Sequence, residues 1–174
     1  MFNLDAFIGA NADFSRGYTF YATVRGPYMK PDDKYLVRSS RLPTSVTDQA
    51  ELNWQGMKYK IGTTQSYSDF TISYQVDVRD DIRYAYETWM NRDIHNPTTN
   101  QHGIVGGFTG GYLGEVVLEH ISHTDLERPI MTYKLRGAWP INIGELALDY
   151  SAKDVATFDV TFAYQYHTID FITS

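Results

Sequence analysis

Histidines and paired carboxylates are the side chains of this 174-residue sequence that could do chemistry. His120, His123 and Asp125 could together bind a metal ion, with His95 and His102 upstream of them. Two residues three apart on a strand point to opposite faces, however, so His120 and His123 are poorly spaced for chelation. The pattern therefore predicts histidines in solvent or at an interface, and no metal site.

Other catalytic and cofactor chemistry lacks its sequence signals. The chain has no cysteine, which excludes disulfides, thiolate zinc sites and cysteine nucleophiles. It has no Gly-x-Ser-x-Gly elbow, and the glycine-rich segment 103–114 has neither the Lys-Ser ending of a P-loop nor dinucleotide-binding spacing. The acidic pairs 32–33 and 80–81 fall in an expected turn and at a helix start. We therefore predict no catalytic residue, no cofactor and no enzymatic activity.

Length and composition indicate one globular domain. Hydrophobic residues make up 43% of the chain and charged residues 21%, near globular averages, while 15% aromatic content favours strands. The formal net charge of −6 argues against a groove for duplex nucleic acid, which needs clustered Lys and Arg. No segment has the length of a membrane-spanning helix or the basic start of a secretory signal. We expect a soluble product without membrane insertion.

Alternation of apolar and polar residues predicts antiparallel sheet with one face in solvent. The clearest alternation runs through residues 157–166 and 70–78. Further strands are expected at 18–24, 34–41, 56–61, 115–121, 131–135 and 145–150, with turns at 26–27, 42–43, 62–63 and 142–144. About eight strands at this spacing predict a β-sandwich or barrel.

One segment, about residues 79–92, breaks the period of two and predicts a flanking α-helix. Its apolar residues recur at helical spacing, and acidic residues at its start suit the helix dipole. The side chains expected to pack on the sheet are Ile82, Tyr86, Trp89 and Met90. Residues 93–114 follow, with Pro97 and six glycines, and predict a long glycine-rich loop.

A corner with a specific residue order lies near the C-terminus. The run from residue 137 reads Gly-Ala-Trp-Pro-Ile-Asn-Ile-Gly-Glu-Leu, in which Pro140 makes Trp139 extended and residues 142–144 can turn the chain. This run resembles the tail tube proteins of contractile-tailed bacteriophages. The residues of this family corner motif are Gly137, Trp139, Pro140, Asn142, Gly144 and Glu145. The resemblance continues upstream through 42–43, 58–62, 69–72 and 89–91, and covers roughly residues 18–165.

The resemblance implies a fold and a function. The fold is an antiparallel β-sandwich or barrel with a flanking helix, shared with the haemolysin-coregulated tube protein of type VI secretion. The function is that of a virion structural protein, assembled in the host bacterial cytoplasm, whose hexameric rings stack into the tail tube that conducts the genome during ejection. The implied partners are further copies of the chain, the tail sheath protein, the tape-measure protein, the baseplate or tube initiator and the tail terminator. DNA would pass through without specific binding.

The resemblance also divides the single domain, residues 1–174, into parts. A projecting inter-ring loop at 44–60 matches the position of the family's extended loop. The chain departs from the family pattern in a longer N-terminal lead, which we assign as an arm at 1–16, in the glycine-rich part of the loop at 93–114, and in a C-terminal tail at 167–174. The residues expected to contact an adjacent ring are Trp54, Gln55, Met57 and Tyr59. The polar strand faces expected to line the lumen carry Thr71, Ser73, Gln75, Asp159, Thr161 and Gln165.

Alternative functions remain open at this point. Within the same fold, the chain could be a tube initiator or baseplate ring, or the tube of a phage-like bacteriocin or injection system. A monomeric glycan-binding β-sandwich would also explain exposed aromatic residues such as Tyr21, Tyr67 and Tyr112, and a metal hydrolase would use the histidines. The assembly state of the purified protein separates these classes.

Overall fold

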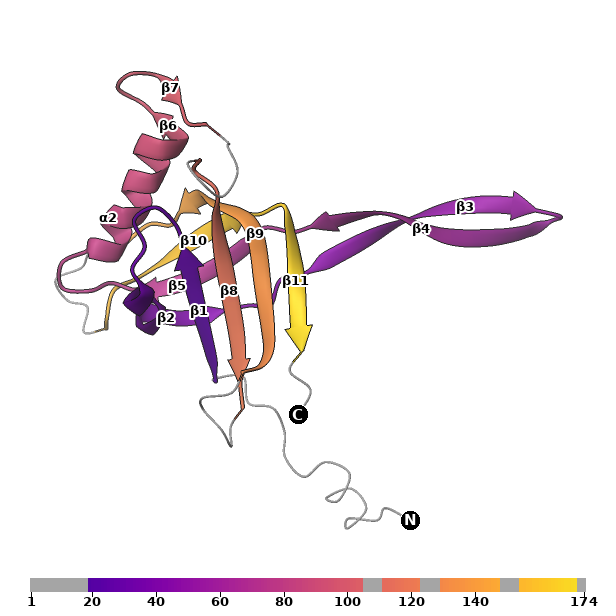
Figure 1. Cartoon of the computed structure of the whole chain (residues 1–174), viewed down its shortest axis with the longest axis horizontal. Coiled ribbons are helices and arrows are strands. Elements are labelled where there is room, and N and C mark those ends of the chain that lie inside the picture. Colours follow the sequence, from indigo (N-terminus) through magenta and orange to yellow (C-terminus); the bar gives the residue numbers. More distant parts are fainter. Residues whose placement is uncertain (1–18, 105–110, 123–128, 148–153, 172–174) are drawn as a thin grey trace, which may run out of the picture.

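Two packed sheets form the body of the molecule, and a long hairpin extends from it. The computed structural model describes residues 19–104, 111–122, 129–147 and 154–171 (Figure 1). The strands of the body are β1 (Phe20–Arg25), β2 (Val37–Ser40), β5 (Phe70–Gln75), β8 (Gly114–Ile121), β9 (Pro129–Ile143), β10 (Thr157–Ala163) and β11 (Tyr166–Phe171). The hairpin is β3 (Ser45–Trp54) and β4 (Met57–Tyr67), and a second, short one is β6 (His95–Asn96) and β7 (Gln101–His102). The helices are η1 (Pro31–Leu36), α2 (Asp81–Thr88) and η2 (Trp89–Ile94). The predicted mainly β, antiparallel fold with one flanking helix is confirmed.

One long strand, β9, belongs to both sheets. Its residues 131–136 lie between β8 and β11, and its residues 139–143 pair with β10. Gly137, with a φ of 62°, stands where the strand changes partners, a backbone conformation that favours glycine. We call the layer β1-β8-β9-β11 sheet A and the layer β9-β10-β5-β2 sheet B.

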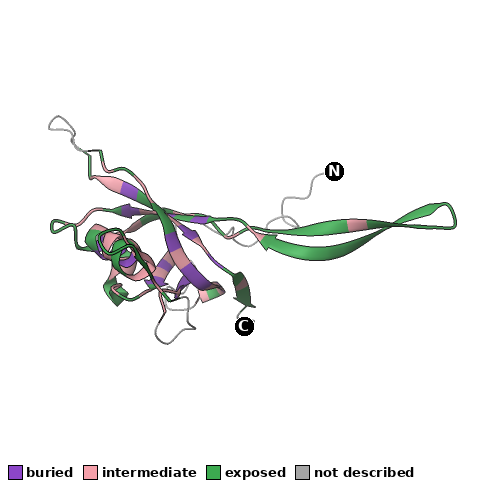
Figure 2. Ribbon diagram, turned by 90° about the horizontal axis from the view of Figure 1, so that it is seen from above, coloured by how far each residue is buried: buried purple, intermediate pink, exposed green. Residues whose placement is uncertain are grey.

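The core lies between the two sheets. It is formed by the apolar positions of the segments that alternate in the sequence. It is built from alternate positions of five strands and is buried in the body of the molecule, whereas the hairpin is exposed along its length (Figure 2). The strand residues of this core are Ala22, Val24, Phe70, Ile72, Tyr74, Val116, Leu118, Leu135, Ala138, Phe158, Val160 and Phe162. The burial of one face per strand is what makes the period of two readable in the sequence.

The helix covers one end of the sandwich. α2 continues into the π-helix η2, so the helical segment runs from Asp81 to Ile94 and overlaps the expected range. Tyr86 and Trp89 are fully buried and their rings stack 6.4 Å apart, while Ile82 is buried and Met90 is only half-buried. The hydroxyl groups of Tyr86 and Tyr74 are hydrogen bonded at 2.7 Å, which ties the helix to β5.

Two strand predictions are wrong in part. Residues 31–36, which overlap the expected strand 34–41, form the 3-10 helix η1, because Pro31 favours a helical start and the Asp33 carboxylate accepts the backbone N–H of Lys30 at 2.7 Å. Of the strand expected at 145–150, residues 145–147 are not in a strand and 148–150 lie outside the described residues.

Four turn and loop predictions also need correction. Of the turn expected at 142–144, residues 142 and 143 are still in β9. The turn expected at 62–63 is inside β4, because Gly62 pairs with Gln49 and a bulge in β3 takes up the irregularity. The loop expected at 93–114 begins with the end of η2 and the short hairpin β6–β7. Residues 167–171 of the expected tail belong to β11, which pairs with β9. The arm expected at 1–16 lies outside the described residues.

Candidate assembly surfaces

The long hairpin is the most exposed regular element of the described chain. Its turn residues Gln55 and Gly56 have φ values of 49° and 81°, the left-handed conformations of a two-residue hairpin turn. Only Ala50 and Tyr67 are even half-buried among the residues of β3 and β4. The loop expected at 44–60 is therefore the outer part of a regular hairpin over 45–67, because cross-strand pairing continues to its end.

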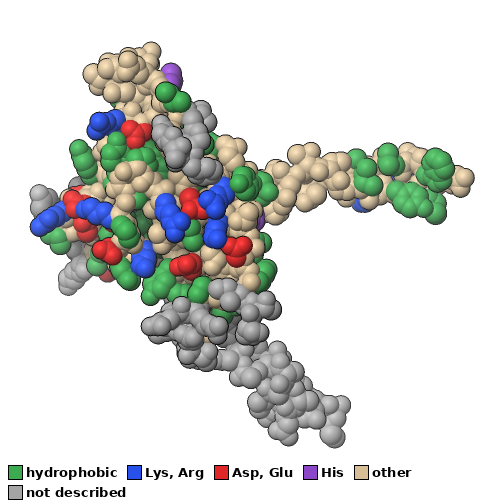
Figure 3. Space-filling model, viewed as in Figure 1, with side chains coloured by type: hydrophobic (Ala, Val, Ile, Leu, Met, Phe, Trp, Pro, Cys, Tyr) green, Lys and Arg blue, Asp and Glu red, His purple; other side chains and the backbone are tan. Residues whose placement is uncertain are grey.

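One face of this hairpin is apolar throughout its outer half. The cross-strand pairs Ala50 with Ile61, Leu52 with Tyr59 and Trp54 with Met57 put their side chains on the same face. The exposed fractions of Trp54 and Met57 are 66% and 61%. Figure 3 shows hydrophobic atoms gathered at the far end of the hairpin. We call Ala50, Leu52, Trp54, Met57, Tyr59 and Ile61 the apolar hairpin face.

Sequence reasoning found part of this face. Trp54, Met57 and Tyr59 belong to it, and Gln55 lies in the turn beside them. Leu52 and Ile61 were not anticipated, although apolar residues alternate on both sides of Gln55-Gly56, which is a hairpin signal. An apolar face of this length without a core to cover indicates a surface that another molecule buries.

The polar residues expected to line a lumen come together on sheet B, with one exception. Gln75 pairs with Thr157, Ser73 with Asp159 and Thr71 with Thr161, which gathers the predicted residues of β5 and β10 on the outer face of the sheet. The hydroxyls of Thr71 and Thr161 are 3.1 Å apart, and the Ser73 hydroxyl donates to the Asp159 carboxylate. Gln165 lies apart from them, at the turn into β11, where its backbone N–H donates to the carbonyl of Arg136 at 3.0 Å.

Sheet A presents a face of paired charges that sequence reasoning missed. Glu115 is only 8% exposed, and its carboxylate oxygens lie 3.1 Å from Arg25 and 2.8 Å from Arg136. Lys134 and Asp170 form another ion pair at 2.6 Å across β9 and β11. Figure 3 shows acidic and basic side chains interspersed over these strands. These charged residues are far apart in the chain and are brought together only by the strand register. No local sequence pattern therefore predicts the ion pairs.

The edges of the two sheets differ in their capacity to pair further. Sheet A ends in β1 and β11, and no described strand pairs with the free side of either. Sheet B ends in the four-residue strand β2 and in the second half of β9, where Pro140 has no N–H to donate. Sheet A is therefore the one whose edges are suited to join a neighbouring strand.

The corner motif residues are architectural. Pro140 is fully buried, and the N–H of Gly144 donates to the carbonyl of Asp159 at 2.6 Å. Arg83 of α2 donates to the carbonyl of Gly144 at 3.0 Å, which fastens the corner to the helix. Trp139 packs edge-on against Tyr112, with ring centroids 6.2 Å apart. Asn142 pairs with Thr161 in the β9–β10 ladder, and Glu145 is exposed after the strand ends.

The histidines do not assemble into a metal centre in the described chain. His95 and His102 face each other across β6 and β7, with ring centroids 4.5 Å apart, while His120 lies on β8. His123 and Asp125 lie outside the described residues. Among the side chains that the structure describes, no three His, Cys, Asp or Glu are arranged to hold a metal ion.

The described helices are also too short or too polar to span a bilayer.

His167 occupies an aromatic cluster where the hairpin meets sheet A. Its ring lies 5.1 Å from that of Tyr67 and 6.1 Å from those of Tyr133 and Tyr164, measured between centroids. Its Nδ1 is buried and has no hydrogen-bond partner among the described residues. Burial lowers the pKa of His167, because the cluster offers the imidazolium nothing in place of water.

This histidine should make the fold sensitive to acid. Its pKa is lower in the folded chain than the ordinary value of about 6.5, so the unfolded chain binds the proton more tightly. The free energy of unfolding is therefore highest above that ordinary value, where His167 is neutral in both states, and it falls as the pH drops through the folded-state pKa. The urea concentration at the unfolding midpoint should therefore be lower at mildly acidic pH than at neutral pH in the wild-type protein. In His167→Phe this difference between the two pH values should become smaller. Exposed His102→Gln is the control, and an unchanged pH dependence in His167→Phe would contradict the assignment.

Comparison with known proteins gives consistent similarities over nearly the whole chain. The family model for phage tail tube proteins matches residues 15–170. The chain is 24% identical to the tail tube protein gp19 of Enterobacteria phage T4 over 157 residues, 90% of this chain and 92% of that protein. It shares its fold with a chain of the anti-feeding prophage cap, with a TM-score of 0.68 at 16% identity, covering 92% and 93% of the two chains. A chain of the sheath–tube complex of an extracellular contractile injection system gives a TM-score of 0.67 at 15% identity, covering 98% and 99%.

Proposed function

The chain belongs to the phage tail tube protein family, and we propose that it is the repeating subunit of the inner tube of a contractile phage tail. In this proposal six copies form a ring and rings stack into a hollow tube. The sheath surrounds the tube, the tape-measure protein fills it before ejection, and the baseplate or initiator and the terminator close its ends. The match of the family model to residues 15–170 carries the proposal. The role is structural, without catalysis.

Electron microscopy of the purified protein tests this function. Negatively stained samples at high protein concentration should contain six-fold rings or tubes of stacked rings. A protein that stays monomeric at every concentration and binds glycans would contradict the proposal. A protein whose activity is lost with a chelator would also contradict it, in favour of a metal hydrolase.

Ring closure is the first step that the surfaces support. We infer that β11 of one copy lies beside β1 of the next, because these are the strands of sheet A with free sides in the described chain. Joining them would continue the sheet around the ring and turn edges that invite aggregation into the means of assembly. Sheet B, with its short β2 and with Pro140 in β9, would form the outer layer.

In this arrangement the free face of sheet A lines the bore, rather than the Thr71 face of sheet B. The ion pairs of Glu115 with Arg25 and Arg136, and of Lys134 with Asp170, belong to this face. Paired charges leave little net field to attract phosphates, so DNA could pass without adhering. Glu119, which pairs with Thr132 on the same face, supplies a third carboxylate for the three cations, so the charges of the proposed bore balance.

Cysteine labelling distinguishes the two faces, because the natural chain has no cysteine. Thr168 lies on the free face of sheet A, opposite Lys134, and Thr71 lies on the outer face of sheet B. Both are exposed in the single chain, so a polymer-linked maleimide should label Thr168→Cys and Thr71→Cys equally in dispersed subunits. In assembled tubes Thr168→Cys should become almost unreactive while Thr71→Cys stays reactive. The opposite result would place sheet B at the bore.

The tube of a contractile injection system is the second candidate. The fold similarity to chains of the anti-feeding prophage cap and of an injection-system sheath–tube complex favours it. The subunit would assemble in the same way, and the difference would lie in the cargo. A cap, initiator or baseplate ring would form single rings that do not continue into tubes, which the same micrographs would show.

A further inference from the structure

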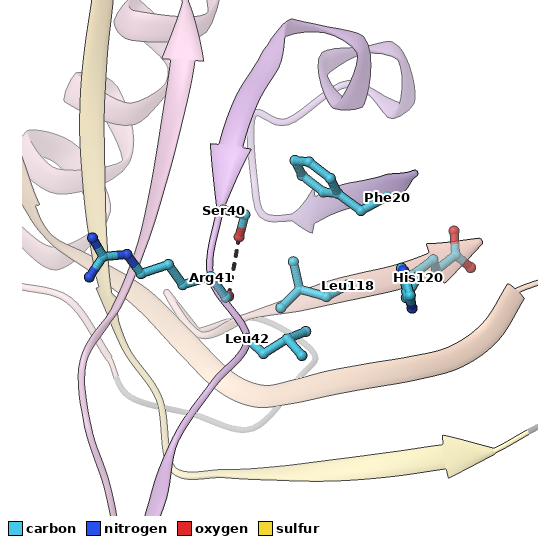
Figure 4. Close-up of a pocket in the computed structure, with 7 residues that line it drawn as sticks. Phe20, Ser40, Arg41, Leu42, Leu118 and His120 are labelled. Atoms are coloured by element: carbon cyan, nitrogen blue, oxygen red, sulfur yellow. Dashed lines mark hydrogen bonds between the residues drawn. The ribbon is translucent and has the colours of Figure 1, made fainter. Parts of the chain in front are cut away.

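A small apolar cavity opens between the two sheets, at the end of β2. It measures about 260 Å³ and lies between β1, β8 and the segment that joins β2 to β3 (Figure 4). Phe20, Leu42 and Leu118 surround it from these three elements, and Ser40 adds a polar residue to its lining. Leu118 is buried, but Leu42 is 56% exposed, so the cavity has an apolar wall that the described chain leaves uncovered.

The size of the cavity indicates its kind of occupant. Sites for cofactors and other small molecules occupy about 300–1,000 Å³, so this one is small for a ligand and suits one or two large side chains. An aromatic residue with a polar handle would fit its chemistry, because a buried indole N–H needs an acceptor. The Ser40 hydroxyl can supply that acceptor.

The same chain carries a matching element that cannot reach the cavity of its own copy. Leu42 lies three residues before Ser45, where β3 begins, and the ten residues of β3 lead away from the body (Figure 1). At about 3.3 Å per residue, Trp54 stands about 30 Å from that starting point. The apolar hairpin face and the cavity can therefore meet only between two copies.

We propose that the end of the apolar hairpin face, led by Trp54, inserts into the Phe20–Leu42–Leu118 cavity of another copy. This inference rests on the proposed function and names the receiving site for the contact between rings. The contact joins two different surfaces, so each copy can insert into one neighbour while it receives another. Such a contact continues without limit unless geometry closes it, which suits a tube that lengthens ring by ring.

Cross-linking of introduced cysteines tests the contact directly. Met57 is the cross-strand partner of Trp54, and Leu42 is at the exposed wall of the cavity. A short bis-maleimide should convert assembled Met57→Cys/Leu42→Cys protein into a ladder of covalent oligomers. Each single variant should give dimers at most, and Met57→Cys/Val155→Cys, with its second cysteine at an exposed residue away from the cavity, should give no ladder.

The outcomes separate this inference from the proposed function. Tubes in the micrographs without a ladder from the 42/57 pair would overturn the contact and leave the tube function standing. Absence of rings and tubes altogether would overturn both. A ladder that forms only after removal of residues 1–16 would assign the cavity to the chain's own N-terminal segment and overturn the contact as well.

A charge in the cavity gives a second test that does not depend on cross-linking. Leu42→Glu should fold normally, since more than half of Leu42 is exposed, but should raise the protein concentration needed for tubes by about tenfold or more. Val155→Glu, at a residue 62% exposed and away from the cavity, is the matched control. Equal tube formation by the two variants would overturn the contact.

Discussion

Removing the outer half of the β3–β4 hairpin should abolish ring stacking while the domain keeps its melting temperature. Gln49 and Gly62 face each other across the hairpin, so residues 50–61 can be replaced by a short polar turn that joins these two residues. The deleted residues are exposed or, for Ala50, half-buried, so the core loses nothing. Single rings should remain where the wild-type protein forms tubes.

The expected size of this effect follows from the apolar area that stacking would bury. A large apolar side chain contributes about 1.5–3 kcal/mol when it is fully buried, and five such side chains stand on this face. Losing even three of them would weaken association by at least about a thousandfold. Electron microscopy and sedimentation measure the change.

The opposite hairpin face provides the control. Glu51 and Lys58 lie on it, with side chains 3.4 Å apart at the surface. The double variant Glu51→Gln/Lys58→Gln keeps the hairpin and its apolar face, so it should assemble like the wild-type protein. Long tubes from the shortened hairpin, or loss of tubes in the Gln variant, would contradict the role of the apolar hairpin face.

Trp89→Ala should strongly destabilise the domain and lower its melting temperature. Trp89 is fully buried, its indole N–H donates to the carbonyl of Tyr112 at 2.8 Å, and its ring lies so close to Gly26 that a Cβ there would be 2.3 Å away. Truncation of such a residue costs about 3–5 kcal/mol, and whole domains are stable by about 5–15 kcal/mol. Tyr112, at the end of the 93–114 segment, would lose its tie to the helix.

Thermal unfolding followed by circular dichroism measures this effect. Tyr84→Ala is the matched control, because Tyr84 lies on α2, which continues into η2 with Trp89, and is 71% exposed. It should unfold within a few degrees of the wild-type protein, since surface substitutions usually change stability by less than about 0.5 kcal/mol. Similar melting temperatures for the two alanine variants would mean that the helix does not seal the core.

The elements that the sequence predicts most securely are those with one buried face. In β5 and β10 the residues that alternate are the ones that the core buries, so the pattern reads directly. The helix was predicted for the same reason, since its apolar positions recur at helical spacing around Tyr86 and Trp89. These elements can be predicted from their own residues, because each has one face buried in the core and one face exposed to solvent.

What the sequence could not specify depends on pairing between distant segments. The Glu115 ion pairs join β1, β8 and β9, and only the register brings their residues together. Residues 31–36 became a helix because Pro31 and Asp33 outweighed a weak alternation. The place of Gln165 was missed because the chain turns into β11 two residues after β10 ends, which moves that side chain to another part of the surface.

The long hairpin would also affect how fast the proposed tubes start and lengthen. A two-stranded hairpin without a core is marginally stable in water, and β3–β4 has almost nothing of its own chain to pack on. Under the proposed stacking, a subunit whose hairpin becomes ordered on docking would lose conformational entropy, and a finished ring would offer it a row of receiving cavities at once. Elongation of an existing tube should therefore be faster than nucleation of new rings. A cell that supplies one nucleus for each tail would then obtain one tube for each tail.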